Sequence, residues 1–184
     1  MGLGKFWLNE LYLDMCVGGD REEWVEIGGP PGDATTHLAL RIFAYSASSS
    51  PDTKLTYTVQ LGDAPVQPNG LISVGGAFSD AKIIRSLTEW GLPERGYVQL
   101  VDTLSKELYD TIGFGDVPAQ ESPTPGGYPT TLLYGAPAVR TIFDGPKCGT
   151  LTVARKSGTG RNDNKSEFCV QIETINQANL DSCE

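Results

Sequence analysis

Several residue types that support common functions are scarce in this chain. Among its 184 residues there are one His and two Met, and 14 Lys and Arg face 23 Asp and Glu, which gives a formal net charge of −9. Because phosphate binding requires a basic surface, this balance excludes sequence-independent binding of DNA or RNA. The sequence also has no hydrophobic run long enough to span a membrane as a helix. We therefore expect neither a nucleic-acid partner nor a membrane span.

The sequence also has few of the residues and motifs that catalysis requires. A single His excludes multi-His metal sites and most His-based catalysis. This residue, His37, stands at the start of an expected strand, where we predict a surface position and no role as a base. The chain has no Gly-x-Ser-x-Gly motif, and its glycine cluster at 28–33 contains two prolines and lacks the Lys-Ser or Lys-Thr of a phosphate-binding loop. We expect a protein that is not an enzyme and holds no cofactor.

Glycine and proline, in contrast, are abundant, with 22 and 12 copies. They separate short segments in which apolar and polar residues alternate, as in strands that bury one face. Such segments recur at a spacing of roughly 8–12 residues, which is typical of a sandwich. In one of them the alternation places Leu55, Tyr57, Val59 and Leu61 on a single face. The expected strands span residues 6–13, 22–27, 38–45, 55–61, 71–75, 97–102, 108–114, 151–155 and 167–172.

We predict one all-β domain over residues 1–184, with two irregular parts. Residues 117–147 contain six prolines and show no clear period, which indicates a long loop or clamp because proline cannot serve a central strand. Residues 173–184 form a polar tail that Cys183 would tie down.

The cysteines are disulfide candidates. An even number without a Cys-x-x-Cys spacing does not resemble a zinc site and favours two disulfides in an exported protein over four buried thiols. The pairing stays open among three connectivities. No signal peptide precedes the first strand, so an exported protein would be represented here by its mature part with an added start. The only glycosylation sequon starts at Asn164. The four cysteines are Cys16, Cys148, Cys169 and Cys183.

An ordered series of segments resembles the lamin-tail domain. The segments are WLNE at 7–10, EWVEI at 23–27, LAL at 38–40, PNGLISV at 68–74, the hairpin 96–102 with 108–115, LTVAR at 151–155 and NDNKSEF at 162–168. The sequence departs from that family in the 117–147 insert and in its tail, where ETIN stands at 173–176 in place of a Pro-Thr-Pro-Gly motif. The missing coiled-coil rod and basic nuclear-localisation run favour the exported bacterial type.

The resemblance implies an immunoglobulin-like β-sandwich with a Pro-rich insert, acting as an interaction module without catalysis. The leading hypothesis is an exported module, extracellular or at the cell surface, that serves adhesion, scaffolding or surface attachment. Its partner would be a protein or a cell-surface carbohydrate. A nuclear, lamin-like interaction domain with reduced cysteines is an alternative.

A second alternative is a secreted, carboxylate-dependent hydrolase. Glu22, Trp24 and Glu26 fall on one strand face, and Glu10 lies nearby if the first two strands pair. Paired carboxylates are the catalytic groups of glycosidases. The competing interpretation is a solvated face, or structural hydrogen bonds to Glu10 and Glu26. We favour it, because the resemblance implies a family without catalysis.

Calcium is the remaining metal hypothesis. Asp20 lies in a Gly-Gly-Asp loop, and Asn162, Asp163 and Glu167 lie in a second oxygen-rich loop. Neither loop has the spacing of an EF-hand, and two basic residues flank the second. Turns rich in Asn and Asp are common without a metal, which is the interpretation we favour.

Aromatic residues offer a binding surface of another kind. Trp7, Trp24 and Trp90, with seven Tyr, would supply stacking for glycans or an anchor for a protein partner. In a sandwich, most such residues belong to the core.

Overall fold

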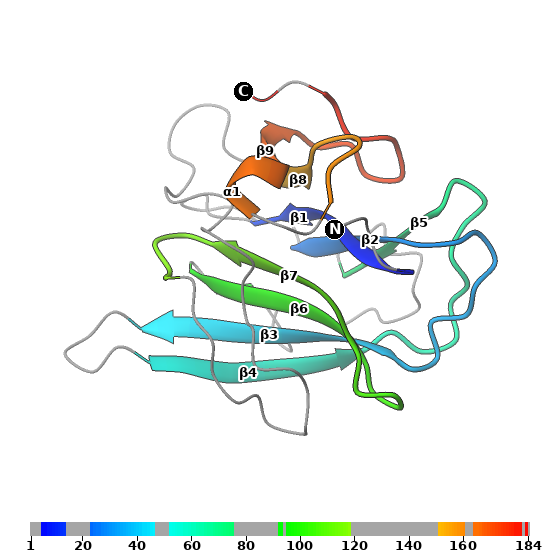
Figure 1. The fold of residues 1–184 in the computed structure, drawn as a ribbon, viewed down its shortest axis with the longest axis horizontal. Coiled ribbons are helices and arrows are strands. Elements are labelled where there is room, and N and C mark those ends of the chain that lie inside the picture. The colour runs from blue at the N-terminus through cyan, green and yellow to red at the C-terminus, as the bar shows by residue number, and fades with distance from the viewer. Residues whose placement is uncertain are drawn as a thin grey trace.

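The structure is a computed structural model that describes residues 5–13, 23–46, 52–75, 92–93, 95–118, 151–160, 164–181 and 183. Within these residues the chain forms two antiparallel sheets and one helical turn (Figure 1). Hydrophobic side chains from both sheets meet in one buried cluster, so the sheets are the layers of a β-sandwich. The prediction of an all-β fold is confirmed.

Several predicted features lie outside the described residues. They are Cys16, Asp20, Glu22, Trp90, Cys148, Asn162, Asp163 and the greater part of the Pro-rich segment, residues 119–147. No helix in the described ranges is long and apolar enough to cross a membrane.

The first sheet has five strands in the order β5-β2-β1-β8-β9. These are β5 (Leu71–Val74), β2 (Trp24–Gly28), β1 (Trp7–Tyr12), β8 (Leu151–Arg155) and β9 (Phe168–Ile172). The helical turn α1 (Asn164–Glu167) leads directly into β9. Strands from the two ends of the chain therefore pair at the centre of this sheet, where β1 lies between β2 and β8.

The second sheet has four strands in the order β4-β3-β6-β7. These are β4 (Asp52–Gln60), β3 (Leu38–Ser46), β6 (Gly96–Asp102) and β7 (Leu108–Phe114). The last two form the predicted hairpin. Its turn is closed by Asp102, whose Oδ1 accepts the backbone N–H groups of Leu104 and Ser105, each at 2.8 Å.

The core lies between the sheets, and alternation accounts for the residues that enter it. Val25 and Ile27 are fully buried there, as predicted for one face of their strand. The opposite faces are covered too, since every residue of β2, β5 and β7 is buried. On the outer face of the four-stranded sheet, Val117 packs against Phe43 and Tyr97. The sandwich therefore has further layers outside its two sheets.

A bulge in β4 turns Leu55 to the face opposite to the predicted one. The register between β3 and β4 shifts between Ile42 and Phe43, so an extra residue of β4 is inserted between Leu55 and Tyr57. Val59 remains in the central core, but Leu55 packs against the outer cluster. The prediction that Leu55 and Val59 share a face is therefore wrong, because alternation holds only up to a bulge.

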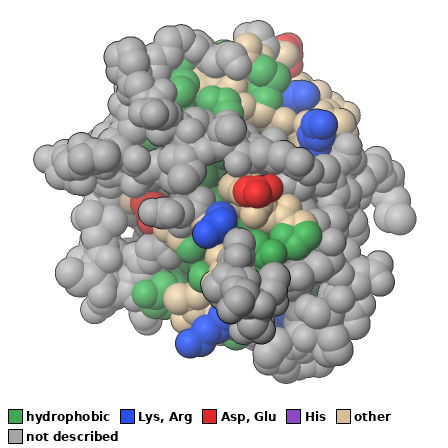
Figure 2. All heavy atoms as spheres, turned by 90° about the vertical axis from the view of Figure 1, so that its left-hand side faces the viewer, with side chains coloured by type: hydrophobic (Ala, Val, Ile, Leu, Met, Phe, Trp, Pro, Cys, Tyr) green, Lys and Arg blue, Asp and Glu red, His purple; other side chains and the backbone are tan. Residues whose placement is uncertain are grey.

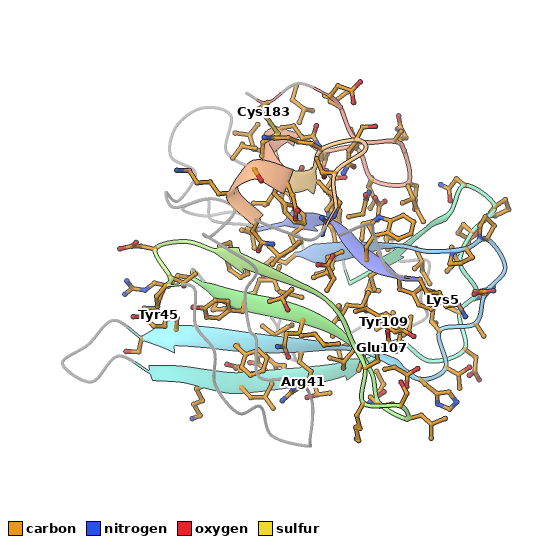
Figure 3. All side chains as sticks on the ribbon, viewed as in Figure 1. Lys5, Arg41, Tyr45, Glu107, Tyr109 and Cys183 are labelled. Atoms are coloured by element: carbon orange, nitrogen blue, oxygen red, sulfur yellow. A yellow bond between two sulfur atoms is a disulfide. The ribbon has the colours of Figure 1, made fainter. Side chains whose placement is uncertain are left out.

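The C-terminal tail is fixed by a disulfide. Cys169 of β9 and Cys183 are bonded, with their Cα atoms 5.6 Å apart, which confirms two of the four predicted disulfide cysteines. Figure 3 shows Cys183 on the side of the molecule that carries α1 and β9. The tail is thus held at its far end, while the residues before it lie against the five-stranded sheet.

We expect the Cys169→Ser/Cys183→Ser double variant to be less stable by about 3 kcal/mol, the chain-entropy value for a loop of this size. The bond closes a loop of 14 residues, and its loss frees the unfolded chain. Urea unfolding of both proteins measures the difference. Substitution is preferable to a reducing agent, because it leaves Cys16 and Cys148 unchanged. An unchanged unfolding midpoint would contradict the prediction.

Candidate functional site

A hollow of about 450 Å³ lies at the end of the five-stranded sheet where β1 begins. Four stretches far apart in sequence build it, namely the start of β1, the turn before β5, the turn after β8 and the C-terminal segment. Its size is within the range of small-molecule sites. The lining residues are Trp7, Asn9, Asn69, Gly70, Leu71, Arg155, Lys156, Ser157, Gly158, Thr159, Gln177, Ala178 and Asn179.

A bulge in β1 places Asn9, which lines the hollow, and its neighbour Glu10 on the same side of the sheet. The register between β1 and β2 shifts between Leu8 and Glu10, so Asn9 is the additional residue. Leu8 and Leu11 both enter the core. Trp7, Asn9 and Glu10 consequently lie on the outer side of the sheet, which strict alternation would not allow for adjacent residues.

The indole of Trp7 lies across Gly28 of β2. These two residues are direct partners in the β1/β2 ladder, and a Cβ atom on Gly28 would stand only 2.1 Å from Trp7 Cε2. Glycine is therefore required for the ring to lie against the strand. Trp7 is partly exposed, and within the described part of the chain its indole N–H has no hydrogen-bond partner. The ring is a fixed aromatic surface on one side of the hollow.

Asn179 fixes another side of the hollow. Its Nδ2 donates to the carbonyls of Asn9, at 3.0 Å, and Arg155, at 2.8 Å. Its Oδ1 accepts from Asn9 Nδ2 at 3.1 Å and lies 3.1 Å from Thr174 Oγ1, whose single proton is shared with Glu10 Oε2. One side chain thus joins the C-terminal segment to β1 and β8. The hollow is built from groups already held in place, which reduces the entropy lost when a ligand binds.

The turn before β5 closes the hollow from the side of β2. Gly70 has φ +82°, a backbone conformation that suits glycine. Asn69 Oδ1 accepts the backbone N–H of Leu71 at 3.1 Å, and its Nδ2 donates to the carbonyl of Asn176 at 3.0 Å. The Pro-Asn-Gly turn recognised in the sequence therefore also contacts the C-terminal segment.

Glu10 lies beneath that segment. It is fully buried, and its Oε1 accepts the Thr152 hydroxyl at 2.5 Å and the Thr174 backbone N–H at 2.9 Å. Its Oε2 accepts the Thr174 hydroxyl at 2.8 Å. Burial raises the pKa of Glu10, while these hydrogen bonds oppose the rise. The carboxylate holds the C-terminal segment against β1 and β8.

Glu26, on the neighbouring strand β2, also holds the C-terminal segment. It is the direct partner of Glu10 in the β1/β2 ladder and is also fully buried. Its Oε1 accepts Asn9 Nδ2 at 2.7 Å, and its Oε2 accepts the backbone N–H of Asn176 at 2.6 Å. Trp24, expected on the same strand face, stacks on Tyr12 with a centroid distance of 6.0 Å. The geometry matches the structural interpretation of this carboxylate pair, since both groups are covered by the tail.

Arg155 connects the two sheets at this end. Its Nη2 pairs with Asp110 Oδ2 of β7 at 2.5 Å, and its Nη1 lies 3.4 Å from Glu167 Oε2. Its Nε donates to the carbonyl of Leu8 at 3.0 Å, and Asp110 Oδ2 accepts the N–H of Leu8 at 2.9 Å. Arg155 and Asp110 together bind both backbone polar groups of one β1 residue. All three charged side chains are buried.

Asn164, the predicted glycosylation site, is fully buried. Its Nδ2 donates to the carbonyl of Thr111 at 3.0 Å, and its Oδ1 accepts the N–H of Gly113 at 2.9 Å. A glycan is carried by an exposed amide, so this geometry has no room for one. Asn164 instead attaches α1 to β7.

Of the four candidate calcium ligands, only Glu167 lies among the described residues. Asp20, Asn162 and Asp163 lie outside them. Glu167 is buried and forms the ion pair with Arg155 described above. Among the described residues no group of three or more His, Cys, Asp or Glu side chains is placed to hold a metal ion. His37 is exposed, as predicted.

Comparison with known proteins found no matching family model, curated protein or solved structure. The lamin-tail resemblance therefore stays a prediction.

Proposed function

We propose that the protein is a non-enzymatic, exported interaction module for adhesion, scaffolding or surface attachment, and that its partner binds at the Trp7 hollow. The observation that carries this proposal is the partly exposed indole, held over Gly28 beside polar side chains that have no hydrogen-bond partner among the described residues. Aromatic residues of this kind provide much of the binding energy at interfaces.

Two further features support the proposal. Glu10 and Glu26, two of the three carboxylates considered for hydrolysis, accept hydrogen bonds that hold the tail. The Cys169–Cys183 disulfide is compatible with an oxidising, extracellular environment.

On the face shown in Figure 2, the coloured hydrophobic, basic and acidic side chains are interspersed, so the described part of that face does not favour a partner of one charge.

The test is capture of cell-surface components by immobilised protein, compared among the wild type, Trp7→Ala and Tyr57→Ala. Tyr57 is a matched control, because it is an aromatic residue 37% exposed on β4 of the other sheet and does not line the hollow. We expect Trp7→Ala to lose about nine-tenths or more of the capture, as for a central aromatic contact, and Tyr57→Ala to keep it. Equal capture by all three proteins would contradict the proposal.

A further inference from the structure

We infer that the Trp7 hollow binds an uncharged sugar residue, which stacks on the indole and forms hydrogen bonds with the surrounding amide and hydroxyl groups. This inference rests on the proposed function and names the class of its ligand. It follows from the aromatic surface, the free polar groups and the charges of the hollow.

The aromatic surface suits the apolar face of a sugar ring. A pyranose presents a patch of C–H groups on one face and hydroxyls around its edge, so it combines apolar area with polar groups as the hollow does. Trp7 supplies a flat, rigid ring whose position Gly28 fixes. An indole can also donate a hydrogen bond from its N–H.

Polar groups without partners stand beside the ring. The Ser157 hydroxyl and the Gln177 side-chain amide line the hollow, are exposed and have no hydrogen-bond partner within the described residues. Each can both donate and accept, which matches the dual character of a sugar hydroxyl. Asn69 and Asn179 line the hollow as well, but their hydrogen bonds to the protein form its frame.

Most of the residues that line the hollow are uncharged, which favours an uncharged ligand. Among the described residues, no acidic side chain lines the hollow, although the whole chain has a net charge of −9. Arg155 is neutralised by Asp110 and Glu167. Lys156 Nζ donates to the carbonyl of Ser166 at 2.9 Å. The hollow thus offers a ligand mainly neutral hydrogen-bonding groups, together with one cation, the Lys156 ammonium, which is held at a backbone carbonyl.

A proline-rich peptide can also stack on tryptophan. Such peptides are extended and dock in grooves lined by several aromatic residues. Trp7 is the only aromatic residue among those that line this hollow in the described structure. The observations therefore favour a compact sugar over an extended peptide.

The experiment is a titration followed through the indole N–H signals in two-dimensional ¹H–¹⁵N NMR spectra. The chain has three tryptophans, and the Trp7→Phe variant assigns the Trp7 signal. The probes are uncharged oligosaccharides of glucose, mannose and N-acetylglucosamine, with a polyuronate and a proline-rich peptide for comparison. We expect one of the uncharged oligosaccharides to shift the Trp7 signal in a saturable manner.

Four variants locate the binding. Trp7→Ala should lower the affinity about tenfold or more. Gly28→Ala should do the same by displacing the indole, since its Cβ would stand 2.1 Å from the ring. Gln177→Ala changes only an exposed side chain and should weaken binding several-fold without unfolding the protein, so it keeps the test valid if Trp7→Ala does not fold. Tyr57→Ala should bind as the wild type does.

The outcomes separate the two proposals. If no uncharged sugar shifts the Trp7 signal while capture still depends on Trp7, the sugar inference is overturned and the binding module stands; a shift by the peptide or polyuronate would then identify the ligand class. If capture does not depend on Trp7, the proposed function fails. Sugar binding that Gln177→Ala and Gly28→Ala both leave unchanged would overturn the assignment to this hollow.

Discussion

Replacing Arg155 with methionine is expected to lower the free energy of unfolding by about 3–5 kcal/mol, the usual cost of removing one partner from a buried ion pair. Methionine fills a similar volume but leaves Asp110 buried without the cation 2.5 Å away. The carbonyl of Leu8 also loses its donor. Thermal and urea unfolding of the variant and the wild type measure the effect.

The control is Lys156→Met, which removes a cation from the next residue. Lys156 Nζ donates to one carbonyl and is not among the buried charges, so we expect a loss of about 1 kcal/mol or less. A similar loss in Arg155→Met and Lys156→Met would refute the role assigned to Arg155.

A double variant distinguishes the energy of the ion pair from the energy of side-chain packing. Asp110→Asn combined with Arg155→Met removes both charges of the closer pair, so Asp110 no longer stays buried as an uncompensated charge, although Glu167 also loses its contact with Arg155. We expect the double variant to be more stable than the sum of the two single losses predicts, because the residues interact directly. Additive losses would mean that the two side chains act independently.

The sequence predicted the strands because most of them bury one face in the core. Val25 and Ile27 alternate with polar or larger residues and enter the core as expected. Alternation did not predict that the opposite faces are covered as well, because the covering residues come from distant segments. The tail that covers Glu10, for example, starts 164 residues further along the chain.

Bulges set a second limit on prediction. The additional residue Asn9 turns both Asn9 and Glu10 to the outer side of the sheet, and the bulge in β4 moves Leu55 to an outer cluster. Both follow from the register with a neighbouring strand, which a single segment does not contain.

The hollow was only partly visible in the sequence. The sequence offers Trp7 as one of three tryptophans that would supply stacking, but it does not indicate Asn179, which lies 170 residues from Asn9. The available signal was the polar Asn-Gln-Ala-Asn run at 176–179, since amides in a tail can bond to exposed backbone. The carboxylate pair was predicted as neighbours on one face, and its structural role was the favoured interpretation.

The Glu10→Gln variant is expected to change how stability depends on pH. Burial raises the folded-state pKa of Glu10 above its ordinary value of 4.5, so between the two pKa values the folded state binds more protons than the unfolded state. Glu10 therefore favours folding at low pH, and this contribution is lost as the pH rises from about 4.5 through the folded pKa. Glutamine does not titrate, so the Glu10→Gln variant does not lose this stability as the pH rises.

We expect Glu10→Gln and the wild type to be similar in stability below pH 4.5, and the variant to be the more stable at pH 7, by about 1.4 kcal/mol for each unit by which the pKa is raised. The side-chain oxygen of glutamine can still accept the bonds from Thr152 and Thr174 that Glu10 Oε1 accepts. Urea unfolding at several pH values measures the difference. A wild type more stable than the variant at pH 7 would contradict the prediction.

Two companion variants show whether the hydrogen bonds act as described. Thr174→Val removes a hydroxyl that lowers the pKa of Glu10, so the stability should fall more steeply with rising pH than in the wild type. Glu10→Ala leaves the buried donors of Thr152 and Thr174 without their acceptor and should be about 2–4 kcal/mol less stable than Glu10→Gln at every pH, since neither alanine nor glutamine titrates. If Glu10 holds the tail, Glu10→Ala should also expose the Thr174 backbone N–H to hydrogen exchange, whereas Glu10→Gln should keep it protected, because only alanine removes the acceptor.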